Sequence, residues 1–115
     1  MDEPLPVPDL TLRQFVTLLT LKSGRLHGPA ITQRSHKLTA GEWPITPGAL
    51  YTTLQRLEAK GLVSSLLVNA RAKNPAHRRR YYQITPRGAR ALTRTLRILQ
   101  KLLNHAKHPN SPPKP

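Results

Sequence analysis

The sequence contains no cysteine, few acidic residues and few aromatic side chains. Without cysteine it forms neither disulfides nor cysteine-based zinc sites. Its five aspartates and glutamates all lie within the first 58 positions, whereas 19 lysines and arginines give a formal net charge of +14. The C-terminal half is therefore cationic throughout. Such a balance favours a nucleic acid or an anionic membrane surface as the partner.

The sequence also lacks signals for secretion and for membrane insertion. Its N-terminus, MDEPLPVPDL, is acidic and interrupted by proline rather than basic and then apolar, which is not typical of a signal peptide. No apolar run approaches the length that spans a bilayer. We therefore expect a cytoplasmic protein in which 115 residues form one small domain with short tails.

The central part of the chain predicts a helix that carries a groove-binding face. Thr46 is a suitable N-cap, Pro47 suits the first helical position, and Gly61 is a suitable stop, which together indicate a helix over residues 46 to 60. One face is apolar at helical spacing: Leu50, Leu54 and Leu57. The opposite face is small and hydrogen-bonding without acids, and it fits a DNA groove: Gly48, Thr52, Gln55 and Ala59.

Similar signals define the elements on both sides of this helix. Thr11 and Gln14 form a T-x-x-Q capping box, and Thr85-Pro86 repeats the Thr-Pro helix start. In chain order we predict an extended arm (1–9), helices over residues 11 to 22 and 28 to 38, a loop (39–44), the helix over 46 to 60, strands over 62 to 68 and 78 to 84 joined by a basic loop (69–77), a helix from residue 86 to about 105, and a disordered tail (107–115). In the second helix, Ile31 and Leu38 are expected to face inward.

This order of elements predicts a winged helix-turn-helix, an α+β fold that is mostly helical. Three helices are followed by a two-stranded hairpin, the wing, and then by one long helix. We assign residues 10–85 to the winged-helix domain and residues 86–106 to a C-terminal dimerisation helix. In a helix-turn-helix the second helix of the motif, here residues 46 to 60, is the recognition helix that lies in the major groove.

Two motifs in this region resemble the PadR family of bacterial transcription regulators. The first is G-x-L-Y-x-x-L-x-R-L-E-x-x-G-L-V, carried here by Gly48 to Tyr51, Leu54, Leu57-Glu58 and Gly61 to Val63. The second is R-x-Y-x-x-T-x-x-G, carried by Arg79 to Tyr82, Ile84-Thr85 and Gly88, and His27-Gly28 and Ile31 also match. The resemblance covers roughly residues 10 to 104, and the two motifs in this order and spacing are fairly specific.

The resemblance implies a homodimeric DNA-binding winged helix, usually a repressor and often released by a small aromatic or hydrophobic effector. Two departures qualify it. Pro29 stands where the family usually has tyrosine, so the contact of the second helix with DNA or core differs. The single C-terminal helix corresponds to the short subgroup, without a large effector-binding domain.

The residues expected to contact DNA lie on the recognition helix and the wing. Thr52, Gln55 and Arg56 can hydrogen-bond base edges, and the wing cations can meet phosphates or the minor groove. Tyr51 is left open between a phosphate contact and packing beneath the helix, and Arg80 is left open as a structural residue. The candidate set is Thr46, Gly48, Tyr51, Thr52, Gln55, Arg56, Lys60, Arg71, Lys73, Arg78 and Arg79.

The last helix carries an apolar stripe and a basic stripe on nearly opposite faces. A helix of about 20 residues spans about 30 Å, more than a small domain needs to cover, so a homodimer interface shared with the first helix is favoured over a purely internal core face. The expected interface is Leu12, Phe15, Val16, Leu19, Ala89, Leu92, Leu96, Leu99 and Leu103. The basic stripe is left open between a solvated face and a DNA contact: Arg87, Arg90, Arg94, Arg97 and Lys101.

Catalytic and metal-binding patterns are missing. No nucleophile–base–acid set or phosphate-binding glycine loop is present, and His105 and His108 lack a third convergent ligand. We expect no enzyme activity, metal or cofactor. The predicted partners are double-stranded DNA with a pseudo-palindromic operator, a second copy of the chain, and a small hydrophobic or aromatic effector. The alternatives are a protein-interaction or assembly module and an RNA-binding protein, although the few aromatic residues weigh against RNA.

Overall fold

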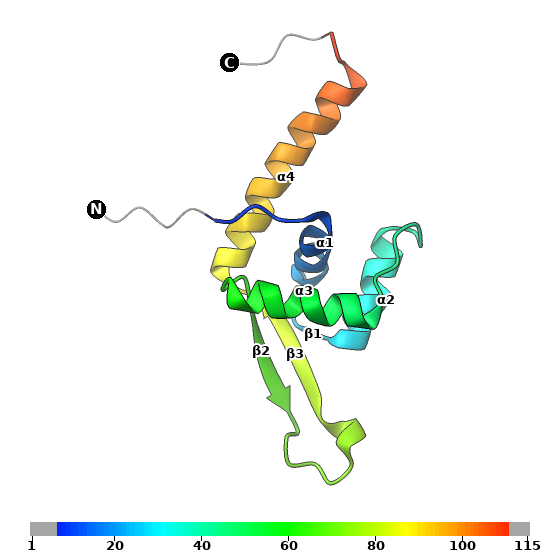
Figure 1. Ribbon diagram of the computed structural model, residues 1–115, viewed down its shortest axis with the longest axis vertical. Helices are drawn as coiled ribbons and strands as arrows, with labels where there is room; N and C mark the ends of the chain where they lie inside the picture. The colour runs from blue at the N-terminus through cyan, green and yellow to red at the C-terminus, as the bar shows by residue number, and fades with distance from the viewer. Residues whose placement is uncertain (1–6, 111–115) are drawn as a thin grey trace, which may run out of the picture.

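The computed structural model describes residues 7–110, which form four helices and a small sheet (Figure 1). The predicted elements are found within about two residues of the expected bounds. Residues 1–6 of the predicted arm and 111–115 of the predicted tail lie outside the described residues. The elements are α1 (Leu12–Leu21), β1 (Leu26–His27), α2 (Gly28–Leu38), α3 (Pro47–Ala59), β2 (Val63–Val68), the 3-10 turn η1 (Pro75–His77), β3 (Arg79–Ile84) and α4 (Pro86–Lys107).

The capping box of α1 explains why that helix begins where the sequence predicts. The Thr11 hydroxyl accepts a hydrogen bond from the Gln14 backbone N–H at 3.1 Å, and the Gln14 side chain accepts one from the Thr11 backbone N–H at 3.0 Å. Two donors that the helix leaves unpaired are thereby satisfied. The helix start therefore depends on residues that are local in the sequence.

The sheet contains one strand that the sequence does not reveal. Its order is β1–β3–β2 and both pairings are antiparallel, with Leu26 opposite Tyr82 and His27 opposite Tyr81. β1 has only two residues, too few for a periodic pattern. Only pairing with the distant β3 makes it a strand. The loop after β2 likewise contains a 3-10 turn, η1, that was predicted only as loop.

The core side of α1 includes two threonines. Leu12 is 61% exposed, whereas Thr17 and Thr20 are fully buried together with Leu18 and Leu21. The two threonines are accommodated because their hydroxyls donate to backbone carbonyl oxygens four residues earlier, at 2.8 and 2.7 Å. A buried hydroxyl whose hydrogen bond is made inside its own helix carries little desolvation penalty. Thr17 and Thr20 can therefore occupy core positions.

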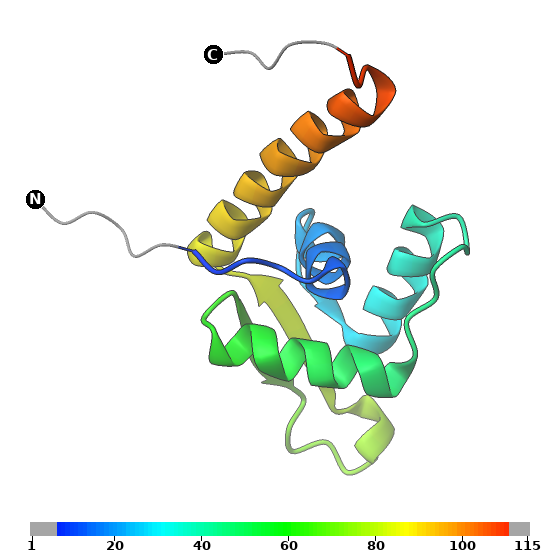
Figure 2. The same cartoon turned by 45° about the horizontal axis from the view of Figure 1, so that its top comes forward.

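The inward orientation predicted for Leu38 is wrong. Ile31 and Ser35 are buried on the inner face of α2, but Leu38 is 52% exposed. It is the last residue of α2, and that end of the helix lies at the edge of the molecule, away from α3 (Figure 2). Within the described part of the chain, no other element packs over the Leu38 side chain.

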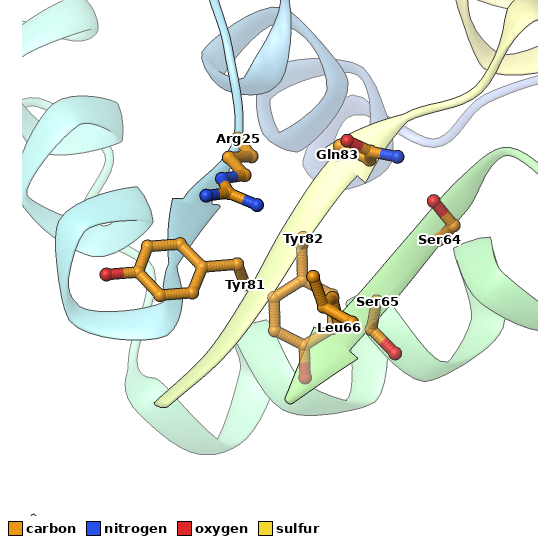
Figure 3. A pocket seen from close by; sticks show the side chains of 7 residues that line it. All are labelled: Arg25, Ser64, Ser65, Leu66, Tyr81, Tyr82 and Gln83. Atoms are coloured by element: carbon orange, nitrogen blue, oxygen red, sulfur yellow. The ribbon is translucent and has the colours of Figure 1, made fainter. Parts of the chain in front are cut away.

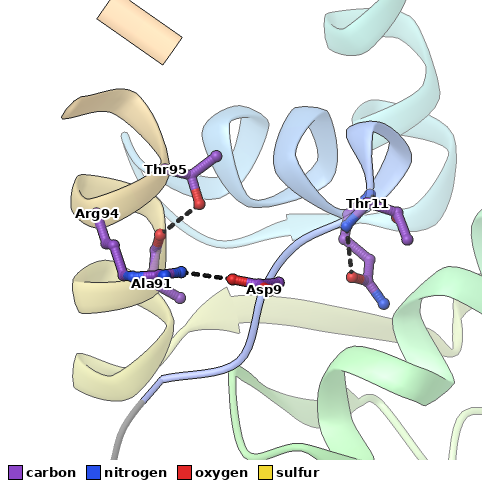
Figure 4. Close-up of polar contacts among 6 residues, drawn as sticks. Asp9, Thr11, Ala91, Arg94 and Thr95 are labelled. Carbon is purple, nitrogen blue, oxygen red and sulfur yellow. Dashed lines mark hydrogen bonds and ion pairs between the residues drawn. The ribbon is translucent and has the colours of Figure 1, made fainter. Parts of the chain in front are cut away.

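α4 is divided into a packed half and a projecting half. Near its start Ala91 and Leu92 are buried, whereas every residue from Arg97 to Asn110 is exposed, and the helix extends beyond the body of the molecule (Figure 1). The N-terminal arm crosses the packed half, where Asp9 accepts a 2.7 Å hydrogen bond from Arg94 in an ion pair (Figure 4). Within the described residues, no helix combines the length and apolarity needed to cross a bilayer.

Candidate nucleic-acid interface

α3 is anchored by one face and presents the other to solvent, as the sequence predicts. Leu50, Leu54 and Leu57 are buried. The candidate residues of the opposite face and flanks are all exposed: Thr46, Gly48, Tyr51, Thr52, Gln55, Arg56 and Lys60. The recognition helix is therefore fixed to the core while its outer surface remains accessible.

Hydrogen bonds in the first turns of α3 leave specific groups available to a partner. The Thr46 hydroxyl accepts from the Ala49 backbone N–H at 3.2 Å, and the Thr52 hydroxyl donates to the Gly48 carbonyl oxygen at 3.1 Å. Thr52 is thus left as an acceptor. The Gln55 side chain makes no hydrogen bond within the described chain, so its amide keeps both donor and acceptor functions.

The wing projects from the body on the hairpin of β2 and β3 (Figure 1). Side-chain hydrogen bonds help to hold its loop: the Asn74 side chain accepts from the Ala76 N–H at 3.0 Å, and Arg78 Nε donates to the Ala72 carbonyl oxygen at 2.9 Å. The four candidate cations of the wing are all exposed: Arg71, Lys73, Arg78 and Arg79. The loop is therefore a shaped cationic projection.

Ser65 connects the recognition helix to both strands of the wing. Its hydroxyl donates to Glu58 Oε2 of α3 at 2.6 Å and accepts from Arg80 Nη1 of β3 at 3.1 Å. The structural alternative left open for Arg80 is therefore observed, although the side chain remains exposed. Beneath this connection, burial raises the pKa of the Tyr82 hydroxyl; the Arg80 guanidinium opposes the shift, and Tyr51 and Glu58 add to it.

The face of the sheet turned away from α3 gathers residues that are distant in the sequence. His27 stacks on Tyr81 with ring centroids 5.7 Å apart, and the Arg25 guanidinium lies 5.3 Å from the centre of the same ring. A small cavity of about 50 Å³ lies between Arg25, Tyr81 and Leu66 (Figure 3). Arg25 carries no sequence signal and His27 only its match to the family pattern, because only the β1–β3 pairing brings them to Tyr81.

The cations of this surface are not neutralised by acids. Among the described residues the sole ion pair joins Arg94 to Asp9, on α4 and the arm, away from the wing. Glu58 reaches Arg80 only through Ser65. α3 and the wing therefore form one surface with a positive potential that favours an anionic partner.

The residues predicted for a dimer interface are divided by the fold. Val16 and Leu92 are buried within the chain itself, Phe15, Leu19 and Leu96 are partly buried, and Leu12, Ala89, Leu99 and Leu103 are exposed. Ile98 and Leu102 extend the exposed group. In the basic stripe, Arg87 donates to the Lys60 carbonyl oxygen at 3.2 Å, and Arg94 pairs with Asp9.

The sequence pattern of the family described as "Transcriptional regulator PadR-like family" matches residues 17–94. The chain belongs to the PadR-like family of transcriptional regulators. That assignment confirms the resemblance seen in the two motifs. The members of the family are transcriptional regulators rather than enzymes. A relative in Mycobacterium tuberculosis, the transcriptional regulator Rv3488, is 42% identical over 79 residues, which are 67% of this chain and 65% of the relative. The match thus spans just under two thirds of that regulator.

Solved structures of transcriptional regulators share the fold. A transcriptional regulator from Clostridium thermocellum superposes with a TM-score of 0.71 at 23% identity, covering 87% of this chain and 90% of that one. PadR of Bacillus subtilis, solved in complex with operator DNA, superposes with a TM-score of 0.65 at 21% identity, covering 75% of this chain and 47% of that one. These similarities confirm the winged-helix architecture.

Proposed function

We propose that this chain binds double-stranded DNA as a sequence-specific transcriptional regulator. One observation carries the proposal: the acid-free outer face of α3 lies beside a projecting wing whose cations have no acidic partner within the described chain. The N-terminal half of α3 enters the major groove, where Thr52, Gln55 and Arg56 meet base edges. The wing meets the phosphates or the minor groove through Arg71, Lys73, Arg78 and Arg79. Family membership supports the same reading.

The protein acts as a homodimer held by the projecting half of α4. Leu99, Leu102 and Leu103 are exposed there and lie near one another on the helix, with Leu12 on α1 as a further exposed apolar residue. An apolar seam of this kind is unfavourable in water on so small a protein. The seam is too short for a free-standing coiled coil, so α1 of the partner covers part of it. Two-fold symmetry would place two recognition helices about one DNA turn apart and favour a pseudo-palindromic operator.

The family resemblance alone supports repression rather than activation and the existence of a small effector. On that basis the protein is a cytoplasmic repressor that a small hydrophobic or aromatic effector releases from its operator. Expression of a reporter gene fused to the bound promoter, with and without the gene for this chain, checks the sign. Higher expression in the presence of the chain would make it an activator.

DNA binding is tested by titrating a labelled duplex at increasing salt. If about six phosphates are neutralised, log K falls with log salt with a slope of about −5. An RNA duplex of the same length is the competitor. Absence of binding, or a response that does not vary with salt, rejects the nucleic-acid function, and preference for RNA replaces DNA by the RNA alternative.

Two variants distinguish the contribution of the recognition helix to DNA binding from that of the wing. Arg71→Ala with Lys73→Ala weakens binding to all sequences and makes the salt slope shallower, since those charges meet the backbone. Gln55→Ala changes the preferred sequence, by about 1–3 kcal/mol at one position. Arg97→Ala on α4 changes an exposed arginine of the basic stripe and is measured separately, because unchanged binding makes that stripe a solvated face. An unchanged selection from random duplexes with Gln55→Ala removes Gln55 from the reading set.

The dimer is tested by sedimentation at micromolar concentration. Leu99→Ala with Leu103→Ala lowers both dimerisation and DNA affinity, because half-site binding loses the second subunit. Leu38→Ala removes an equally exposed leucine from α2 and leaves the dimer intact. A wild-type monomer that protects a single half-site contradicts the dimer, and a dimer that survives the double substitution places the interface elsewhere.

A further inference from the structure

A cationic hollow separates the recognition helix from the wing. It has a volume of about 320 Å³ and is bounded by the start of α2, the first turn of α3, η1 and the start of β3. Those segments lie on the same side of the molecule (Figure 2). The lining includes His27 and Pro29 from the start of α2, Tyr51 from α3, and Arg78, Arg79 and Arg80 from the wing.

The chemistry of the hollow fits an oxyanion. Guanidinium groups of the wing arginines and the phenol hydroxyl of Tyr51 supply hydrogen-bond donors, and none of the lining residues is acidic. The His27 ring is stacked on Tyr81, on the other face of the sheet. Two of the guanidiniums are held in place, because Arg78 Nε donates to the Ala72 carbonyl oxygen and Arg80 Nη1 donates to Ser65. Each still has further N–H donors. The nearest acid, Glu58, is occupied by the Ser65 hydroxyl.

The position of the hollow between the recognition helix and the wing indicates that the oxyanion it binds is a phosphate of the DNA backbone. When α3 lies in the major groove and the wing reaches the adjacent minor groove, one sugar–phosphate strand runs between them, because a single backbone separates the two grooves. From the DNA-binding function proposed above, we infer that the hollow seats one phosphodiester of that strand, held by Arg80 and Tyr51. Arg80 lies outside the predicted DNA-binding set.

Tertiary structure creates this seat from distant parts of the chain. Arg80 of β3 is placed by Ser65 of β2 at 3.1 Å, and Tyr51 comes from α3. Tyr51 is 54% exposed. In the proposed seat Tyr51 contacts the phosphate, and Arg80 both braces the wing and binds.

The seat is tested with duplexes in which one phosphate at a time is neutral. A duplex selected from a random pool by the wild-type chain is synthesised with a methylphosphonate at each position in turn. At one phosphate per half-site, the substitution weakens wild-type binding about tenfold, the scale of one charge-assisted hydrogen bond. Arg80→Ala weakens binding to the unmodified duplex by a similar factor but adds no further loss at that phosphate, since the partner is already gone.

Three further variants distinguish a phosphate contact from a purely structural role of Arg80. Ser65→Ala removes the brace of Arg80 but keeps the guanidinium, so the tenfold effect at that phosphate persists. Ala76→Tyr fills the hollow from η1 without removing charge and weakens binding, whereas Ala70→Tyr, on the exposed loop outside the hollow, does not. If Arg80→Ala does not fold, the comparison of Ala76→Tyr with Ala70→Tyr still tests the phosphate contact.

The outcomes distinguish this inference from the function on which it rests. If the wild-type chain binds no duplex, the DNA-binding function itself fails. If it binds but the losses from Arg80→Ala and methylphosphonate add at every position, the seat is wrong while the function stands. The seat is equally wrong if Ala76→Tyr and Ala70→Tyr bind alike.

Discussion

Two helices of this chain begin with the same three residues but in opposite surroundings. Ile45-Thr46-Pro47 begins α3 and Ile84-Thr85-Pro86 begins α4. In both, the threonine hydroxyl accepts a backbone N–H three residues later, at 3.2 Å from Ala49 and 3.0 Å from Gly88. Proline occupies the first helical position in each case. The local chemistry of the two starts is therefore equivalent.

The surroundings of the two starts determine what each does. A Cβ placed on Gly48 would meet nothing within 4 Å, whereas one on Gly88 would overlap the Leu62 carbonyl oxygen and lie 2.9 Å from Ile84 Cγ1. Thr85 also donates its hydroxyl to the Gly61 carbonyl oxygen at 2.7 Å. The start of α4 is thus locked against the end of α3, while the start of α3 remains free to approach DNA. The same helix-start motif fixes α4 to the end of α3 in one place and leaves the start of α3 exposed to solvent in the other.

Gly88→Ala should produce the largest loss of stability in this comparison. The new methyl group overlaps backbone atoms that cannot rotate away, so the N-terminus of α4 must separate from the end of α3. We expect a loss of about 1–3 kcal/mol or more in the free energy of unfolding, the scale of overpacking. Urea denaturation followed by circular dichroism measures it. Unchanged stability contradicts the lock between the two helices.

Thr85→Ala should destabilise the protein about twice as much as Thr46→Ala. Both variants lose an N-cap, worth about 1 kcal/mol, but Thr85→Ala also loses the hydrogen bond to Gly61, worth about another 1 kcal/mol. The same urea titration compares them, with each Thr→Ser variant as a control that keeps the hydroxyl. Equal losses for the two alanine variants mean that the bond to Gly61 contributes nothing measurable.

Gly48→Ala should have the smallest effect on stability and the opposite sign. Alanine is the better helix former by up to about 1 kcal/mol, and the space around the site is open. DNA affinity is expected to fall, since the methyl group prevents close approach of the backbone to phosphate. Unfolding and duplex titrations on the same preparation give both values. A loss of stability, or an unchanged DNA affinity, rejects this account of the site.

Much of the fold and most of the exposed candidate residues follow from local signals. The capping residues of α1, α3 and α4 act within three residues of themselves, and the apolar spacing of α3 identifies its inner face correctly. The wing strands are found because β2 is a short apolar run and β3 alternates. Each of these features depends on neighbours in the sequence, which is why the sequence predicts it.

The predictions that failed concern which surface a neighbouring element covers. Leu38 has the spacing of a core residue but lies where no described part of the chain packs, and β1 exists only through its pairing with β3. The phosphate seat inferred above is of the same kind, since Tyr51 and Arg80 approach it from separate elements. No periodicity within one segment carries that information.

The sequence by itself determined where the helices and strands lie, that the C-terminal half is cationic, and, through two motifs, the family. Tertiary structure alone decided which members of one apolar stripe are inside, with Leu92 2% exposed and Leu103 57% exposed on the same helix. It also decided which of two identical helix starts faces solvent. The physical reason is that hydrogen bonds in a cap or a helix close over a few residues, whereas burial depends on every element that packs nearby.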